Sequence, residues 1–406
     1  MLEFSIGGLL FAILLILVPL ILRNIGNYRR EAFLIVNIAV FGLTFSDITA
    51  AAIAAAWILI PYFAAPLIAG NGKKSAVARK IFYILMLLVF LYLMHYEWIV
   101  IFRYMPYSPV LKFLGLSYLL FREVDFTMQY SYLQETNTKI SLADYLNYLL
   151  SFYTIMAGPI MRYEEFIQDF YREDRPKLEE NDMLMTFQRI LTGYIEVYVI
   201  SALMSGWGAY WFDRVPKAGN LAKAVIIYFI FSIFNALFIY FNFVGYCDIV
   251  VGGAKLSGMT LKENFDRPYM ARTMVEFWNR HHISLSEWIR DYIYSPIIKM
   301  LLSGAFKKKL FEAQCIALFA TFLIAGIWHG TNLNYVVYGL LEGLGVVISS
   351  LYTNGLKKKY GKKGFKEYEK KRGVIIFEHI WTCAYVCISF SFVGYDVIGM
   401  LMGNIK

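Results

Sequence analysis

Long runs of apolar residues recur along almost the whole chain, and this feature limits the possible folds most. The first run, residues 5–22, contains no charged side chain, and runs of similar character follow it. A helix needs roughly 20 apolar residues to cross a bilayer, within a range of about 17–25. Because backbone polar groups in lipid must be bonded internally, these runs predict spanning helices, and no alternating strand pattern competes with them. The candidate spans are residues 5–22, 32–46, 48–69, 81–102, 107–121, 139–157, 184–205, 221–246, 310–327, 332–353 and 374–402.

The composition supports the same conclusion. Of the 406 residues, 59% are hydrophobic and only 17% are charged, whereas a typical soluble domain has roughly 45–50% apolar and about 25% charged residues. A secreted disulfide scaffold, a disordered chain and a soluble enzyme are excluded on this ground. Two short candidates, residues 32–46 and 107–121, indicate tilted, broken or re-entrant helices that pack inside protein. The sequence predicts an all-α polytopic membrane protein, with residues 1–406 in a single integral-membrane domain.

Basic residues occur in short clusters between the apolar runs, which is typical of cytoplasmic loops. One cluster lies at residues 23–30, another at residues 307–309, and nine Lys or Arg residues occupy residues 357–372. The net charge of +9 is therefore interpreted as a signal of membrane orientation and not of nucleic-acid binding. If the spans alternate, the N-terminus and residues 328–332 lie on the extracytoplasmic side.

Residues 254–300 break the apolar pattern although they lie among the predicted spans. Charged and aromatic residues are interleaved there, and from Met274 to Tyr294 the apolar positions recur at near-helical spacing. A helix this polar cannot face lipid. The pattern predicts a helix that lies at the interface, or packs inside the bundle and lines a wet cavity.

Three histidines are candidates for chemistry. His281 and His282 lie in this polar stretch, and His329 lies at the tip of an apolar hairpin. His329 is either an interfacial histidine that reaches toward the membrane surface or a general base. Imidazole has an ordinary pKa of about 6.5, so at neutral pH it is largely free to accept a hydroxyl proton. Gly330 beside it would allow a substrate to approach the backbone closely.

Other kinds of site have little support. The chain contains no GxSxG, Walker, HExxH or Rossmann glycine pattern, which argues against a serine nucleophile, a nucleotide site and a zinc site. The four cysteines lie in apolar segments without a CxxC pair and are interpreted as packing residues. His95 and His379 are isolated and are interpreted as boundary or packing residues. We expect no bound cofactor and no metal.

Six short motifs, in this order, resemble the membrane-bound O-acyltransferase (MBOAT) family. They are FLGLSYLLFR at 113–122, AGPIMRY at 157–163, GYCD at 245–248, ENFDRPY at 263–269, FWNRHHISLSEWIRDY at 277–292 and WHG at 328–330. They fall within a family region of about residues 113–345 and combine features of the teichoic acid D-alanylation branch (DltB) and the alginate O-acetylation branch (AlgI). Position 281 is His where the family usually has Trp, and alignment on HISLS selects His282 as the family histidine.

The resemblance implies a fold and a mechanism. The fold would be a ring of about 11 transmembrane helices around a thin core with re-entrant or interfacial helices, and the two histidines would lie near a tunnel. His329 would deprotonate the acceptor hydroxyl, and His282 would orient the substrate or stabilise developing charge. Asn264 is interpreted as a residue that holds broken helices together. Weaker candidates for the tunnel lining are Asn279, Arg280, Trp328 and Asp291; Asn279, Arg280 and Asp291 could instead join Arg290 in a buried salt-bridge network.

The resemblance also implies the substrates and the partners. The acyl group, acetyl or D-alanyl, would come from a cytoplasmic thioester, either acyl carrier protein phosphopantetheine or acyl-CoA. The acceptor would be a hydroxyl group of an extracytoplasmic cell-envelope polymer, a teichoic acid or a polysaccharide. The expected partners are membrane lipid, a cytoplasmic acyl carrier protein and an extracytoplasmic partner acyltransferase, and the expected location is a bacterial plasma membrane.

Two other functions stay open at this stage. A transporter or flippase for an envelope precursor would also tolerate intramembrane charges and broken helices. A scaffold subunit could keep the motifs without activity. Replacement of His329 by alanine separates these functions, because it should abolish acyl transfer and leave transport or scaffolding largely intact.

Overall fold

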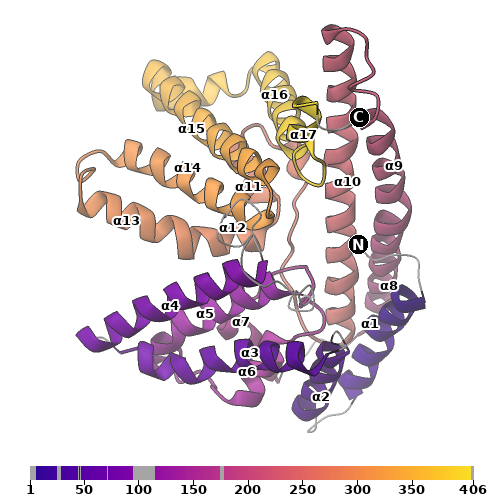
Figure 1. Cartoon of the computed structure of the whole chain (residues 1–406), viewed down its shortest axis with the longest axis vertical. Helices are drawn as coiled ribbons and strands as arrows, with labels where there is room; N and C mark the ends of the chain where they lie inside the picture. Colours follow the sequence, from indigo (N-terminus) through magenta and orange to yellow (C-terminus); the bar gives the residue numbers. More distant parts are fainter. Residues whose placement is uncertain are drawn as a thin grey trace. The chain divides into compact units, whose positions relative to one another are not determined.

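The computed structural model describes residues 6–24, 29–43, 45, 47–70, 72–94, 115–173 and 178–403 (Figure 1). Within these ranges the chain is helical, and the only β-type pairing is an isolated antiparallel bridge between Phe265 and His281. The chain divides into two compact units, one of Met1–Ile195 with Gly245–Glu263 and the other of Glu196–Val244 with Asn264–Lys406. We call them unit 1 and unit 2 and describe each by itself.

Unit 1 contains the N-terminal helices. They are α1 (Ile6–Asn24), α2 (Arg29–Gly42), α3 (Ile48–Ile68), α4 (Lys73–Met94), α5 (Leu116–Glu135), α6 (Leu142–Leu149), α7 (Tyr163–Tyr171) and α8 (Glu180–Ile195). Its core is aromatic: the Phe126 ring lies 4.6 Å from the Tyr145 ring and 5.0 Å from the Tyr163 ring, measured between centroids. The last part of α10 (Leu221–Leu256) belongs to the same unit.

Unit 2 contains the rest of α10 and the C-terminal half of the chain. Its other elements are the π-helical turn η4 (Glu196–Ile200), α9 (Ser201–Phe212), the 3-10 turn η5 (Pro268–Met270), α11 (Met274–Arg280), α12 (Ile283–Ile289), the π-helical turn η6 (Arg290–Tyr294), α13 (Ser295–Ser303), α14 (Leu310–His329), α15 (Leu333–Tyr368), α16 (Arg372–Phe390) and α17 (Val397–Leu401). Helices α14 and α15 pack closely enough that a Cβ atom built on Gly326 would lie 2.3 Å from the Cα atom of Gly339. The two backbones therefore touch where the helices cross.

Most of the predicted spans coincide, in whole or in part, with long apolar helices of the structure. Among the described residues, seven helices are long and apolar enough to cross a membrane: Ile48–Ile68, Lys73–Met94, Glu180–Phe212, Leu221–Leu256, Leu310–His329, Leu333–Tyr368 and Arg372–Phe390. The chain is thus an all-α, multi-pass membrane protein. The count of about 11 spans and their ring arrangement stay predictions, and residues 95–102 of one predicted span, with His95, lie outside the described residues.

The prediction of a span at residues 139–157 is wrong. Helix α6 ends at Leu149, and turns follow it up to residue 162. The buried Arg122 guanidinium closes the helix end, because it donates to the carbonyl oxygens of Tyr148 (3.2 Å), Leu149 (2.6 Å) and Thr154 (2.8 Å). The turn is apolar because protein covers it: the side chains of Phe152 and Tyr153 are both 0% exposed. Hydropathy does not distinguish such a turn from a segment in lipid.

Two other predicted spans also have different boundaries. In the span predicted at residues 107–121, helix begins only at Leu116 and continues to Glu135, and residues 107–114 lie outside the described residues. Gly115 precedes it with φ +79°, and a Cβ atom there would lie 2.1 Å from the Ile155 carbonyl oxygen. The span predicted at residues 374–402 is interrupted, because α16 ends at Phe390 and α17 begins at Val397.

Candidate active site

The polar stretch of unit 2 does not form the continuous helix that its spacing predicts. Helix α11 ends at Arg280, and α12 begins at Ile283. Between them, His282 has left-handed backbone angles, φ 49° and ψ 53°. This conformation is uncommon for a residue other than glycine. A strained backbone at a buried position persists only where the surrounding structure holds it in place.

Asn264 holds the break between α11 and α12. Its Oδ1 atom accepts hydrogen bonds from the Ser284 backbone N–H (3.0 Å) and the Ser284 Oγ hydroxyl (2.9 Å). Its carbonyl oxygen accepts a third from the N–H of Ile283 at 3.0 Å. The Asn264 side chain is buried. These contacts explain the ENF part of the fourth motif: Asn264 joins a broken helix, as expected.

The two adjacent histidines are buried among aromatic rings. His281 stacks on Phe277 with ring centroids 5.0 Å apart and an interplanar angle of 17°. His282 meets the edge of Phe243 at 4.6 Å. Burial lowers the pKa of both imidazoles, and the neighbouring His329 lowers each of them further. Both rings are therefore neutral at neutral pH.

His329 is the last residue of α14, close enough to His281 and His282 to interact with them electrostatically. Its ring lies 4.5 Å from the Trp328 ring and 5.6 Å from the Tyr338 ring, measured between centroids. Gly330 follows in an extended conformation, so its backbone does not require glycine. A Cβ atom at Gly330 would lie 2.1 Å from an atom of the Tyr335 ring. The expectation that Gly330 leaves room for a substrate is therefore wrong, because Tyr335 fills that place.

A cavity of about 380 Å³ lies beside His329. Its walls are mainly apolar, and its polar lining residues are Asn279, Ser286, Glu287, Arg290, Tyr294, Thr321, His329, Tyr338 and Glu342. Next to apolar walls, hydrogen bonds and charges act more strongly than in bulk water. The cavity therefore suits a reaction in which a polar group accepts a proton from a substrate.

The structure brings some of the predicted site residues to this cavity and not others. His329 and Asn279 line it, whereas His282, Arg280, Trp328 and Asp291 are not part of its lining. Arg280 forms an ion pair with Glu276 at 2.7 Å, and Asp291 forms one with Arg290 at 3.3 Å. Both pairs are partly exposed, so they do not form the buried network that was the alternative expectation.

Glu342 is a buried carboxylate of this cavity that the sequence analysis missed. It lies in α15, is 1% exposed, and accepts a hydrogen bond from Trp278 Nε1 at 2.9 Å and another from Ser389 Oγ at 2.6 Å. The available signal was one carboxylate within the apolar run 332–353, and an ionisable residue inside a span indicates function by default.

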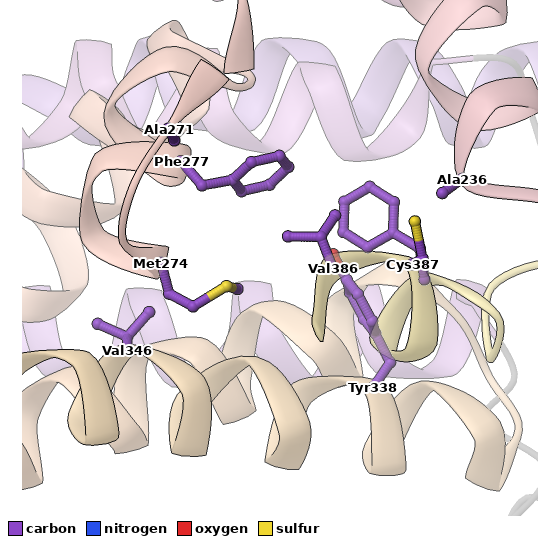
Figure 2. Close-up of a cluster of buried hydrophobic side chains, with 9 residues drawn as sticks. Ala236, Ala271, Met274, Phe277, Tyr338, Val346, Val386 and Cys387 are labelled. Carbon is purple, nitrogen blue, oxygen red and sulfur yellow. The ribbon is translucent and has the colours of Figure 1, made fainter. Parts of the chain in front are cut away.

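An apolar cluster supports the cavity wall and the buried histidines. Figure 2 shows it, with Phe277 from α11, Tyr338 from α15, and Val386 and Cys387 from α16. Tyr338 belongs both to this cluster and to the cavity lining. All four cysteines are free thiols; Cys247 and Cys387 are buried, and Cys315 and Cys383 are half-buried. Among the described residues, no group of three or more His, Cys, Asp or Glu side chains is arranged to hold a metal ion.

Comparison with known proteins gives consistent matches. The sequence model of the membrane-bound O-acyltransferase family matches residues 110–395. The teichoic acid D-alanyltransferase of Bacillus subtilis is 26% identical over 95% of this chain and 96% of that protein. The probable alginate O-acetylase AlgI of Pseudomonas putida is 28% identical over 59% of this chain and 46% of that protein. The peptidoglycan O-acetyltransferase of Helicobacter pylori is 30% identical over 54% of this chain and 40% of that protein.

Proposed function

Because the chain belongs to the membrane-bound O-acyltransferase family and is therefore an O-acyltransferase, we propose that it moves an acetyl or D-alanyl group onto an envelope polymer. The donor is a cytoplasmic thioester, and the acceptor is a hydroxyl group of an extracytoplasmic teichoic acid or polysaccharide. Relatives that act on teichoic acid, alginate and peptidoglycan support this class of acceptor. The observation that carries the proposal is the position of His329, on the wall of a mainly apolar cavity of about 380 Å³.

The proposed reaction uses His329 as the general base. Its imidazole takes the proton of the acceptor hydroxyl while the oxygen attacks the thioester carbonyl carbon. A C–O bond forms, the C–S bond breaks, and the leaving thiolate receives the proton from the imidazolium. General-base assistance contributes about 10²–10⁴-fold, so the positioning of the two substrates supplies much of the remaining rate enhancement.

His282 has a supporting role in this proposal. It is buried, neutral and close enough to His329 to interact with it electrostatically. Its left-handed backbone, held through Asn264, fixes where its ring lies. We assign His282 to the orientation of the substrate or the stabilisation of developing charge.

The donor, the partners and the location follow from the same proposal. The thioester is carried by acyl carrier protein phosphopantetheine or by CoA, and because a thioester is already activated, no resident cofactor is needed. The proposal includes an extracytoplasmic partner acyltransferase that works with this chain. In the proposed orientation, the basic clusters at residues 307–309 and 357–372 lie on the cytoplasmic face of a bacterial plasma membrane, because clusters of this kind are typical of cytoplasmic loops. The N-terminus then lies outside.

The test is the amount of alkali-released acyl groups in the cell envelope, identified by mass spectrometry. Cells carry the intact protein, His329→Ala or His379→Ala at matched expression. His379 is a suitable control because its ring nitrogens contact the carbonyl oxygens of Ile375 and Met270, both at 2.7 Å, and it does not line the cavity. We expect released acetate or D-alanine to fall only in His329→Ala. Equal release from all three would remove His329 from the mechanism and favour the transporter or the scaffold.

A further inference from the structure

Glu342 is a buried carboxylate in the cavity that contains His329, and the mechanism above does not use it. Its two hydrogen-bond donors, the Trp278 indole and the Ser389 hydroxyl, are both neutral. No Lys, Arg or His side chain forms an ion pair with it within the part of the chain that the structure describes. A charge held in an apolar interior without a partner of opposite sign is costly.

The hydrogen bonds around Glu342 allow both of its protonation states. Ser389 Oγ lies 2.6 Å from Oε1 of Glu342 and 3.0 Å from the carbonyl oxygen of Val386. When the carboxyl is protonated, it can donate to Ser389 Oγ, which then donates to Val386. When the carboxyl is ionised, Ser389 donates to it instead. The site can therefore hold a neutral acid by itself and a carboxylate beside a bound cation.

A ligand in the cavity can supply that cation. A carboxylate has about four acceptor positions on its two oxygens, and Trp278 and Ser389 occupy two of them. Glu342 and Tyr338 are one helical turn apart on α15, which places their Cβ atoms about 5–6 Å apart. The Tyr338 ring in turn contacts the His329 ring at 5.6 Å. Glu342, Tyr338 and His329 thus line the same cavity, and one ligand bound there can meet both the carboxylate and the imidazole.

We propose that Glu342 binds the ammonium group of an α-aminoacyl donor, so that the enzyme selects an aminoacyl group over an acetyl group. This inference rests on the proposed acyl transfer and decides between the two acyl groups that it leaves open. In an α-aminoacyl thioester the ammonium nitrogen is bonded to the carbon beside the reacting carbonyl, so the ammonium group and the carbonyl enter the cavity together, and both Glu342 and His329 line it. An acetyl group has no cation at that position and would leave the buried carboxyl without its partner, which disfavours binding.

The experiment compares three non-hydrolysable pantetheine amides that carry D-alanyl, D-lactoyl and acetyl groups. The D-lactoyl group has nearly the same size as the D-alanyl group but carries a neutral hydroxyl in place of the ammonium. Their dissociation constants are measured on the purified full-length protein by calorimetry. We expect the D-alanyl probe to bind about 10- to 100-fold more tightly than the D-lactoyl probe, the range for a hydrogen bond to a charged group. The ratio of these two affinities is measured on the unmodified protein, so it does not depend on whether a variant folds.

Two variants assign the preference to the Glu342 carboxylate. In Glu342→Gln, which has nearly the same shape but no charge, we expect the ratio of the two affinities to fall close to one. In His379→Ala, which lies outside the cavity lining and leaves the surroundings of Glu342 intact, we expect the ratio to persist. A ratio close to one in the unmodified protein, an unchanged ratio in Glu342→Gln, or failure of the D-alanyl probe to bind would each overturn the role of Glu342.

The envelope assay separates this inference from the proposed function. Acyl release that depends on His329, together with a ratio close to one, would leave the acyl transfer standing and refute only the role of Glu342. Release that does not depend on His329 would refute the proposed mechanism on which both rest.

Discussion

Replacement of Gly330 by alanine tests the geometry around His329 most directly. The backbone of Gly330 is extended, with φ −174° and ψ 171°, so an alanine can adopt it without strain. The added Cβ atom, however, would lie 2.1 Å from Cε2 and 2.2 Å from Cδ2 of the Tyr335 ring. Because non-bonded carbon atoms normally lie about 3.5–4.0 Å apart, the ring or the backbone must move by roughly 1.4 Å. The substitution therefore acts through space and not through backbone conformation.

The expected effects have two parts. Inserting a methyl group into a packed site costs about 1–3 kcal/mol of unfolding free energy, which thermal unfolding of the purified protein measures. His329 is the adjoining residue, and a displacement of about 1 Å near a reacting group lowers rates by about 100-fold. We expect alkali-released acyl groups to fall accordingly in cells that carry Gly330→Ala at matched expression.

A second substitution makes the argument falsifiable. Removing the ring in the double variant Gly330→Ala with Tyr335→Ala should restore most of the lost activity, with Tyr335→Ala alone as the reference. Gly355→Ala is the matched glycine control, because a Cβ atom there would meet no atom within 4 Å. Undiminished activity in Gly330→Ala, or a double variant no better than the single one, would refute the steric explanation.

Three further predictions concern stability. Asn264→Ala should lower the free energy of unfolding by about 2 kcal/mol or more, because buried groups of Ser284 lose an acceptor; thermal unfolding against Ser284→Ala checks this. Burial lowers the pKa of His281 in the folded chain, so below about pH 6.5 the unfolded chain binds more protons than the folded chain. The free energy of unfolding should therefore fall on acidification to about pH 5, by as much as about 2 kcal/mol. His281→Phe should reduce this fall, and an equal fall in both proteins would contradict the prediction. Arg122→Lys should cost about 2 kcal/mol or more, because one ammonium cannot serve the three carbonyl oxygens that the guanidinium bonds; an unchanged melting temperature would contradict it.

The sequence identified most of the long helices but not the buried turn after α6. Hydropathy measures how apolar a segment is, and Phe152 and Tyr153 are as apolar inside protein as they would be in lipid. What ends the helix at Leu149 is Arg122, which lies 27 residues earlier in the chain. No local pattern contains that contact.

The break at His282 shows the same limit at the candidate site. Local spacing favours one helix from Met274 to Tyr294, and nothing in those residues calls for a left-handed histidine. Asn264 imposes the break with hydrogen bonds from outside the helix, 20 residues from Ser284. The motif resemblance selected His282 and His329 as candidates, but the separation of His282 from the cavity lining needed the structure.

Glu342 was visible in the sequence as a lone acid, but its surroundings were not. Its two donors are 64 and 47 residues away in the chain, on α11 and α16. A pattern confined to α15 cannot show that an indole and a hydroxyl converge on the same carboxyl group.

The crossing of α14 and α15 at Gly326 and Gly339 has a mechanical consequence. No side chain separates the two backbones there, so no rotamer change can alter the spacing of the two helices. His329 lies at the end of α14, and Glu342 lies on α15 shortly after the crossing. Any opening or closing of unit 2 would carry the base and the carboxylate together as one rigid hairpin. The separation between His329 and Glu342 is then fixed by the helix crossing. A substrate that contacts both residues has to fit this separation.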